Sequence, residues 1–287
     1  MSLTSLLEGS RSMRDYLRAT LPLPARPKLP GLVAPSQTTR YSLLGTAFDY
    51  ALRWHCQIRC PNAISRDHWV AEHLAVMSSS AKLRTAAAAS TWTARHWLDY
   101  ARSSGRYPLP LLRAAIELAR LDTIYRSGKG FEDIGQPVDP VDVADLVCLV
   151  QAIPPDLVNP EQFCLLNPVF EQGSLVGGAD ADVVLGDTLI EIKVTKNPTI
   201  ERIWIDQLLG YFLLYRYGGF HGLAEQPRVT HVGIYFARHG TLLRWPIAGF
   251  GSDQVLDAAV VRLREHCGDF LHTPHLPIGA SSKEQSP

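Results

Sequence analysis

One stretch near the middle of the chain, residues 177–193, constrains the fold more than any other segment. Residues 183–185 and 189–190 are apolar runs of strand length, and Gly186 and Asp187 between them have the composition of a tight two-residue turn. Side chains alternate between the two faces of a strand. The sequence therefore predicts a β-hairpin here, with one face turned toward a core.

This hairpin places three charged side chains close together. Glu191 and Lys193 project from the same face of the second strand, while Ile192 points into the core. If the two strands pair in register, Asp182 lies near Glu191 across the ladder. Two such carboxylates can share a hard divalent cation, which prefers oxygen ligands and keeps several waters. Lys193 can then orient or help deprotonate an attacking water, so the pattern suits metal-dependent phosphodiester hydrolysis.

The bare pattern of acids and lysine also arises from surface salt bridges, so its context matters. Arginine supplies almost all of the positive charge of this chain, and only six lysines are present. A lysine at position 193 in that background indicates a need for a compact, titratable amine. Asp180 shares a strand face with Asp182, but the apolar run begins directly after Asp182, which makes Asp182 the preferred acid.

A helix is predicted directly after the hairpin, because residues 201–215 carry apolar side chains at helical spacing. Gln207 and Tyr211 are four residues apart and share one face of it. The alternative is that Tyr211 is a half-buried core aromatic and Gln207 a solvated neighbour.

Together, Asp182, the Glu-Ile-Lys sequence at 191–193 and the pair Gln207 and Tyr211 resemble the motifs of the PD-(D/E)xK nuclease superfamily. The helix with the Gln-x-x-x-Tyr pattern resembles the corresponding helix of the RecB-like branch of that superfamily. The resemblance covers about residues 160–250, under a third of the chain. It implies a nuclease that hydrolyses phosphodiester bonds in DNA with the help of Mg²⁺ or Mn²⁺.

The same resemblance implies a role for each residue. Asp182 and Glu191 are expected to bind the metal, with the backbone carbonyl of Ile192 as a further ligand. Lys193 is expected to be the catalytic lysine. The glutamine and tyrosine of the following helix are expected to line the cleft and steady the substrate.

The upstream motif has two candidates. The RecB-like branch often carries a Gly-x-x-x-His helix, and here Gly45 has the spacing but Asp49 stands in the place of the histidine. A carboxylate can serve a hard metal equally well. Other branches supply a helical glutamate, for which Glu117 is the candidate. The alternative for Glu117 is an ion pair with Arg113 or Arg120 on a solvated helix face.

The formal net charge is zero, so the chain is not a polycation that coats nucleic acid, and any DNA groove must be locally basic. Arg120, Arg126 and Lys196 are the candidate phosphate contacts. The arginines can equally form a solvated helix face. No motor motif is present, so unwinding would need a partner, such as a helicase or another nucleic-acid-processing or defence protein.

Five cysteines without a visible secretory signal predict reduced thiols and a cytoplasmic location. No apolar run is long enough to span a bilayer, so no membrane partner is expected. Some RecB-like nucleases hold an iron–sulfur cluster through one early cysteine and three cysteines close together near the C-terminus. Only Cys267 follows the expected core here, so no iron–sulfur cluster is expected.

The chain divides by pattern into four parts. Residues 1–40 contain a short helix and a proline-spaced connector. Residues 41–157 have helical periodicity, with helices at 42–59, 66–78, 82–103, 109–127 and near 140–152. Residues 158–273 form the nuclease core, with a strand within 162–171, the hairpin, the helix, a second strand pair at 231–237 and 241–247, and a helix at 255–267. Residues 274–287 form a polar, disordered tail.

The predicted fold is therefore α/β: a restriction-endonuclease-like core with a mixed sheet flanked by helices, preceded by a mainly helical region. The sequence lacks a glycine-flanked serine elbow and a phosphate-binding loop, which disfavours a serine hydrolase and a nucleotide-driven enzyme. The alternative function is a catalytically inactive module that keeps the fold and binds nucleic acid or protein.

Overall fold

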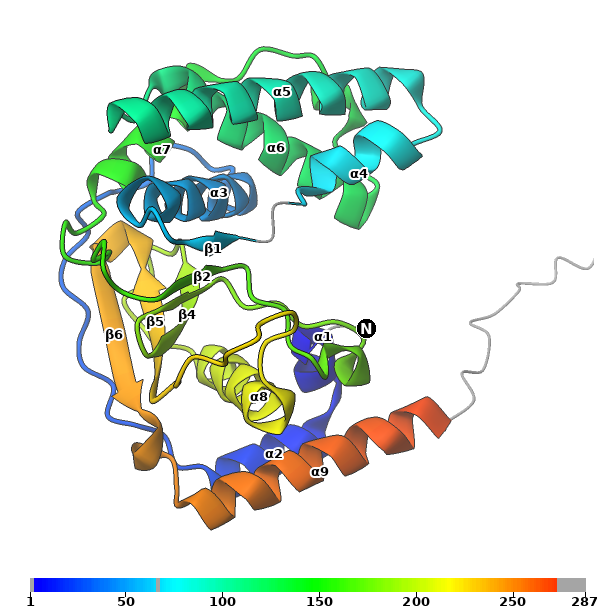
Figure 1. Ribbon diagram of the computed structural model, residues 1–287, viewed down its shortest axis with the longest axis vertical. Coiled ribbons are helices and arrows are strands. Elements are labelled where there is room, and N and C mark those ends of the chain that lie inside the picture. The colour runs from blue at the N-terminus through cyan, green and yellow to red at the C-terminus, as the bar shows by residue number, and fades with distance from the viewer. Residues whose placement is uncertain (1–2, 66–67, 273–287) are drawn as a thin grey trace, which may run out of the picture.

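A mixed β-sheet runs through the middle of the molecule (Figure 1). The computed structural model describes residues 3–65 and 68–272. Within them, six strands lie in the order β1-β2-β3-β4-β5-β6. β1 pairs in parallel with β2, and β4 with β5, while the other neighbours are antiparallel. The bounds are β1 Ile64–Ser65, β2 Cys164–Leu166, β3 Val183–Leu185, β4 Thr188–Lys193, β5 His231–Phe236 and β6 Thr241–Pro246. The predicted α/β class with a mixed sheet is confirmed.

The β3–β4 hairpin has the predicted register. Val183 pairs with Ile190, and Leu185 pairs with Thr188, which leaves Gly186 and Asp187 as the two-residue turn. Gly186 has a φ of 59°, the positive value that the first central residue of a type II′ turn requires. Continuing the same register places Asp182 opposite Glu191.

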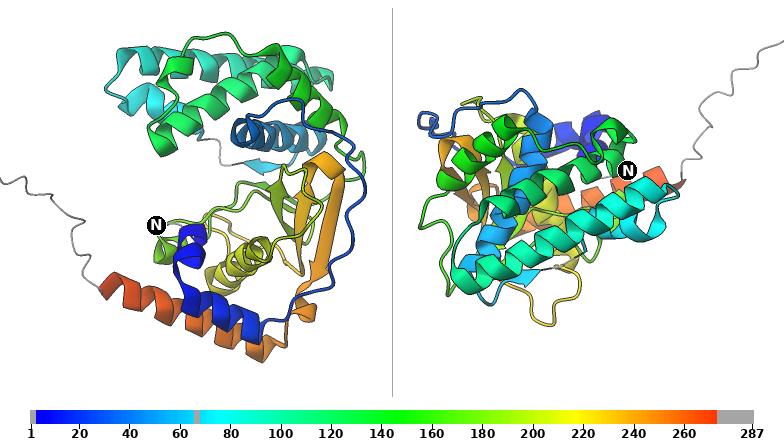
Figure 2. Two further views of the ribbon diagram at one scale, coloured as in Figure 1. Left: turned by 180° about the vertical axis from the view of Figure 1, so that it is seen from behind. Right: turned by 90° about the horizontal axis from the view of Figure 1, so that it is seen from above.

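The helices form two layers, one on each face of the sheet, as Figures 1 and 2 show. The first layer contains α3, which precedes β1, and the α-helices between β1 and β2. It consists of α3 Tyr41–Arg59, α4 Val70–Met77, α5 Ala81–Ser104, α6 Leu109–Ser127 and α7 Pro140–Gln151. The second layer consists of α1 Leu3–Gly9, α2 Arg11–Thr20, α8 Arg202–Gly218 and α9 Asp253–His272.

Local capping explains where the long helices begin and end. The Ser80 hydroxyl accepts a hydrogen bond from the Leu83 amide at 3.3 Å at the start of α5. Asp139 accepts similarly from Val141 at 2.9 Å at the start of α7. Gly105 ends α5 in the left-handed region, where glycine is favoured. The predicted boundaries of these two helices are therefore correct to within one residue at each end.

Several elements differ from the expectation. The helix predicted at 66–78 is the shorter α4, Val70–Met77, and the helix predicted at 255–267 is the longer α9, Asp253–His272. The strand predicted within 162–171 is short, because Asn167 adopts a φ of 49° and Pro168 follows it. The residues 1–20 form two helices, separated at Ser10, whose hydroxyl caps α2. β1 was not expected, since two residues carry no periodicity. The tail at 274–287 lies outside the described residues.

The helical region is one wall of the core. Its buried side chains, among them Phe48 and Trp54 of α3, form a continuous apolar cluster with Val183, Ile190 and Tyr235 of the sheet. Residues 41–157 therefore cover one sheet face and also supply β1 to its edge. Along the described residues, no helix is both long and apolar enough to cross a bilayer.

The N-terminal helices belong to the opposite layer. Leu3, Leu6 and Leu7 of α1 are buried in the cluster that α8 and α9 share with the sheet. A Cβ atom at Gly210 of α8 would lie 2.9 Å from a methyl carbon of Leu3. The glycine therefore permits the close approach of α1 to α8.

A buried ion pair joins the connector, the helical layer and the sheet. Arg238, directly after β5, donates to both carboxylate oxygens of Asp145 on α7 at 2.8 and 3.0 Å, and to the Ala34 carbonyl at 3.1 Å. Both charged side chains are at most 1% exposed. Asp145 also accepts from the Gln37 amide at 3.2 Å. The pair is fully hydrogen-bonded on the carboxylate side, which offsets the cost of burial.

Arg238→Met should therefore lower the free energy of unfolding by about 3–5 kcal/mol, because it leaves Asp145 buried without its cation. Urea denaturation measures this. The matched control is Arg244→Met, which breaks an exposed ion pair with Asp187 and should cost less than about 1 kcal/mol. Equal effects of the two substitutions would contradict the account of the buried pair.

Candidate active site

A cavity of about 380 Å³ opens where the two helical layers meet at one end of the sheet. α3 and α6 line it from the first layer, and α1 and α8 line it from the second. Five carboxylates face it, against two arginines, Arg53 and Arg126. The carboxylates are those of Asp49, Asp122, Asp180, Asp182 and Glu191. The cavity is therefore acidic, not basic as a DNA groove was expected to be.

The structure brings Asp182 and Glu191 together in this cavity, as the hairpin register predicted. The Ile192 amide donates to Oδ2 of Asp182 at 2.6 Å and fixes that carboxylate beside β4. Burial raises the pKa of Asp182 well above its usual range, and the Glu191 carboxylate raises it further. Burial also raises the pKa of Glu191, although Lys193 opposes this. The two acids thus repel each other in a poorly solvated place.

A chain of hydrogen bonds connects Glu191 to α8. The Lys193 amine donates to Oε1 of Glu191 at 2.8 Å and to Oε1 of Gln207 at 3.3 Å. The Gln207 amide nitrogen then donates to the Tyr211 hydroxyl at 3.0 Å. Glu191, Gln207 and Tyr211 line the cavity. Lys193 is not part of the lining, and its amine lies 5.8 Å from the centre of the Trp204 ring. Tyr211 and Gln207 are both buried and both line the cavity. The alternative was therefore right that Tyr211 is a core aromatic and wrong that Gln207 is solvated.

Tyr211 is held by stacking as well as by this bond. Its ring lies 5.5 Å from that of Phe170, with the planes 14° apart. Burial raises the pKa of the phenol, so the hydroxyl stays protonated at neutral pH.

The upstream candidate Asp49 faces the cavity. It lies one turn after Gly45 on α3, and both line the cavity together with Tyr50 and Arg53. Asp49 forms an ion pair with Arg53 one turn further on. Sequence reasoning missed Arg53, although its spacing of four from Asp49 places it on the same helix face.

The rival candidate Glu117 lies elsewhere. Its carboxylate accepts from the Ser90 hydroxyl at 3.1 Å, and it lines a separate cavity of about 330 Å³ between α5 and α6. The structure thus brings Asp49, but not Glu117, to Asp182 and Glu191.

A second pair of residues at the site was also missed. The Tyr50 hydroxyl donates to Oδ1 of Asp122 at 2.9 Å. Burial raises the pKa of Asp122 to about 6, even though the tyrosine and Arg126 favour its charged form. Asp122 reaches the cavity from α6, which no local pattern reveals, because only the packing of α3 against α6 decides it.

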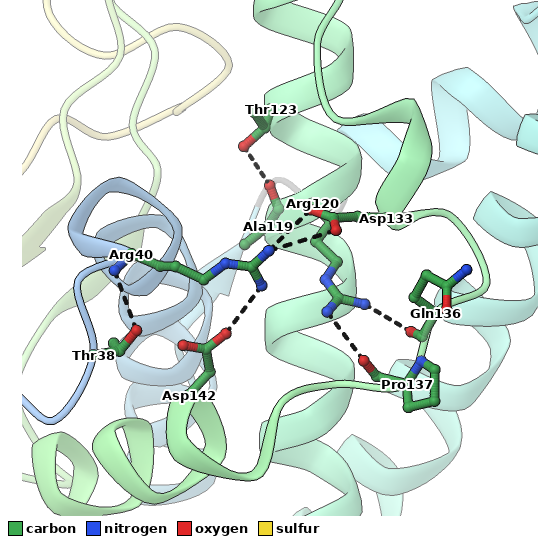
Figure 3. Close-up of polar contacts among 9 residues, drawn as sticks. All are labelled: Thr38, Arg40, Ala119, Arg120, Thr123, Asp133, Gln136, Pro137 and Asp142. Carbon is green, nitrogen blue, oxygen red and sulfur yellow. Dashed lines mark hydrogen bonds and ion pairs between the residues drawn. The ribbon is translucent and has the colours of Figure 1, made fainter.

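The three basic residues predicted to contact nucleic acid differ in placement. Arg120 is buried, and its guanidinium donates to the carbonyls of Gln136 and Pro137 at 2.8 and 3.2 Å (Figure 3). It holds the loop before α7, so the expectation for Arg120 is corrected to a structural role. Arg126 lines the cavity with an exposed side chain. Lys196 lies outside the cavity lining, with its amine 5.2 Å from the centre of the Tyr41 ring.

Within residues 3–65 and 68–272, no group of three or more His, Cys, Asp or Glu side chains is arranged to hold a metal ion. Asp182 and Glu191 are thus two neighbouring carboxylates and not part of a complete protein cage for a metal. Mg²⁺ is commonly bound by one or two carboxylates and keeps several waters, so a pair suits it.

Comparisons of the chain with models of known protein families, with curated proteins and with solved structures found no match.

Asp122→Asn should make the metal-free protein more stable at pH 8 by up to about 3 kcal/mol. The native pKa of about 6 exceeds the ordinary 3.8, so the native state keeps a proton that the unfolded chain loses between these values. Wild-type stability therefore falls as pH rises from about 4 to about 6, and the asparagine variant, which can still accept from Tyr50, avoids that loss.

Urea unfolding in EDTA at pH 4.5 and pH 8 checks this prediction. The advantage of the variant should be small at the lower pH and largest at the higher one. An advantage that does not change with pH would show that the charge of Asp122 is not its cause.

Proposed function

We propose that this protein is a Mg²⁺-dependent nuclease that hydrolyses phosphodiester bonds in DNA, built on a restriction-endonuclease-like core of the PD-(D/E)xK type and its RecB-like branch. One observation carries the proposal. Asp182 and Glu191 meet in an acidic cavity, with the Ile192 peptide between them and the Lys193 amine bonded to Glu191.

The donor set fits a hard divalent cation. Both carboxylates have raised pKa values because of burial, and each is close to other acids. A dication between them would relieve that repulsion, which favours binding. Because the amide of Ile192 points to Asp182, its carbonyl, on the same side of the strand, is directed there as well. Asp182, Glu191 and the Ile192 carbonyl would hold the metal, which supplies Lewis-acid activation of the phosphate and of water.

The remaining residues position groups around this pair. Lys193 is held by Glu191 and Gln207, so its amine sits directly beside a ligand carboxylate. From there it orients the attacking water and offsets charge that develops on the phosphate. Gln207 and Tyr211 shape the wall, and Arg126 and Lys196 are candidate contacts for neighbouring phosphates.

Cleavage of end-labelled single-stranded, linear duplex and circular DNA, in Mg²⁺, Mn²⁺ or EDTA, tests the function. We expect a metal-dependent product from the wild type. Asp182→Asn, Glu191→Gln and Lys193→Met should each slow cleavage by about 10²–10³-fold or more.

Glu117→Gln is the matched control, because this acid lies in the separate cavity and its substitution should leave the rate within twofold. The same assay with RNA compares the two substrates. A wild-type protein that binds DNA but yields no product on any substrate would contradict the enzyme and favour the binding module.

A further inference from the structure

One face of α3 meets the carboxylates of the proposed metal site. Gly45, Thr46, Asp49, Tyr50 and Arg53 all line the cavity. Their spacing of four and one places them along a single side of the helix. This face contributes one acidic side chain, Asp49, and one basic side chain, Arg53, to the cavity. The contact between these two side chains therefore determines which of them can bind a ligand there.

Arg53 is fixed by its neighbours. Its Nη2 contacts Oδ2 of Asp49, its Nε donates to the Asp49 carbonyl at 3.4 Å, and its guanidinium lies 4.8 Å from the centre of the Tyr50 ring. Its side chain is 16% exposed. Within the described part of the chain, Nη1 has no hydrogen-bond partner. A planar guanidinium held at one edge keeps its other donor for a ligand.

The surroundings of Arg53 are anionic on more than one side. Burial by itself would lower the pKa of Arg53, but Asp49, Tyr50, Asp182 and Asp122 together raise it above its ordinary value. The guanidinium thus interacts electrostatically with Asp182, the proposed metal ligand. It is one of two arginines that face the cavity among the described residues.

Asp49, by contrast, already has a cationic partner. Its carboxylate is paired with Arg53 on the same helix, and it forms no three-acid group with Asp182 and Glu191 in the described chain. An acid bound to an arginine one turn away commonly orients that arginine. It is poorly suited to serve a cation at the same time.

We propose that Arg53 binds the phosphate group of the substrate in this cavity, and that Asp49 is the positioning residue that holds the Arg53 guanidinium toward Asp182, not a metal ligand. The inference rests on the proposed function, because it needs a phosphodiester to enter the same cavity. A guanidinium matches phosphate oxygens in geometry and charge. In a cavity lined by five carboxylates, a guanidinium beside the proposed metal offsets the repulsion that an anion would meet.

The test measures two affinities separately. The first is that of a labelled single-stranded DNA oligonucleotide, by anisotropy in Ca²⁺ with gels to verify that no product forms. The second is that of Mn²⁺ alone, by calorimetry. The proteins are the wild type, Arg53→Gln, Arg53→Lys, Asp49→Asn, the double variant Asp49→Asn/Arg53→Gln, Asp182→Asn and the control Arg59→Gln, each checked for folding by circular dichroism.

Arg53→Gln should lower the affinity for the oligonucleotide about tenfold or more. It should also reduce by about one the slope with which the logarithm of this affinity falls against the logarithm of the salt concentration. The affinity of Arg53→Lys should lie between those of this variant and the wild type, since lysine keeps the positive charge but lacks the two parallel donors of a guanidinium. The matched control is Arg59→Gln, with the same charge change on the exposed end of α3, which should stay within twofold.

Asp49→Asn should also lower the affinity for the oligonucleotide, yet leave the Mn²⁺ affinity within about threefold of the wild type. Adding it to Arg53→Gln should cause no further loss of oligonucleotide affinity, because both act through one contact. Asp182→Asn should lose Mn²⁺ binding at least tenfold.

Two results would overturn the inference while leaving the nuclease intact. One is unchanged oligonucleotide affinity in Arg53→Gln. The other is a loss of Mn²⁺ affinity in Asp49→Asn as large as that in Asp182→Asn, which would make Asp49 a ligand. A wild type that neither binds Mn²⁺ nor cleaves DNA would overturn the proposed function, and this inference with it.

Discussion

The pairing of β3 with β4 decides where the side chains of the candidate site lie. The turn at Gly186 and Asp187 sets the register, so Asp182 faces Glu191, and the alternation of β4 places Lys193 on the same side. A slip of one residue would turn Glu191 and Lys193 toward the helical region and Ile192 toward α8. The charged side chains, buried as they are, would then have no partners. A two-residue turn with glycine in its required conformation is therefore the constraint on which the site depends.

The hairpin alone does not form the candidate site, because the cavity around its carboxylates is lined by side chains of both helical layers. The first helical layer supplies Asp49, Arg53, Tyr50 and Asp122, and the second supplies Gln207 and Tyr211. These layers cover opposite faces of the sheet, and each packs on it through an apolar cluster. α8 packs directly onto β4 and β5. The helical region is also joined to the segment directly after β5 through the buried pair of Arg238 and Asp145. The geometry of the cavity thus also depends on residues that do not line it, such as Arg238 and Asp145.

Much of the fold could be predicted because its signals are local. The hairpin, the long helices and the helix of Gln207 follow from periodicity, turns and caps within a few residues. β1 could not be found, because a strand of two residues exists only through its partner β2. The pairing of Asp182 with Glu191 was accessible for the same reason as the hairpin. Asp122 was not, since its approach to the site is a property of how α6 packs against α3. Arg53 was accessible through its spacing of four from Asp49, but it was missed. The basic residue Arg120 was misjudged because charge says nothing about the carbonyls of a distant loop that it binds.

The central claim is that Asp182 and Glu191 hold a divalent cation, and anomalous diffraction from crystals grown with Mn²⁺ tests it most directly. The account predicts one strong anomalous peak between the two carboxylates, within coordination distance of the Ile192 carbonyl, and no such peak in Asp182→Asn crystals. A cavity without a peak at millimolar Mn²⁺, with the Lys193 amine still bonded to Glu191, would contradict it.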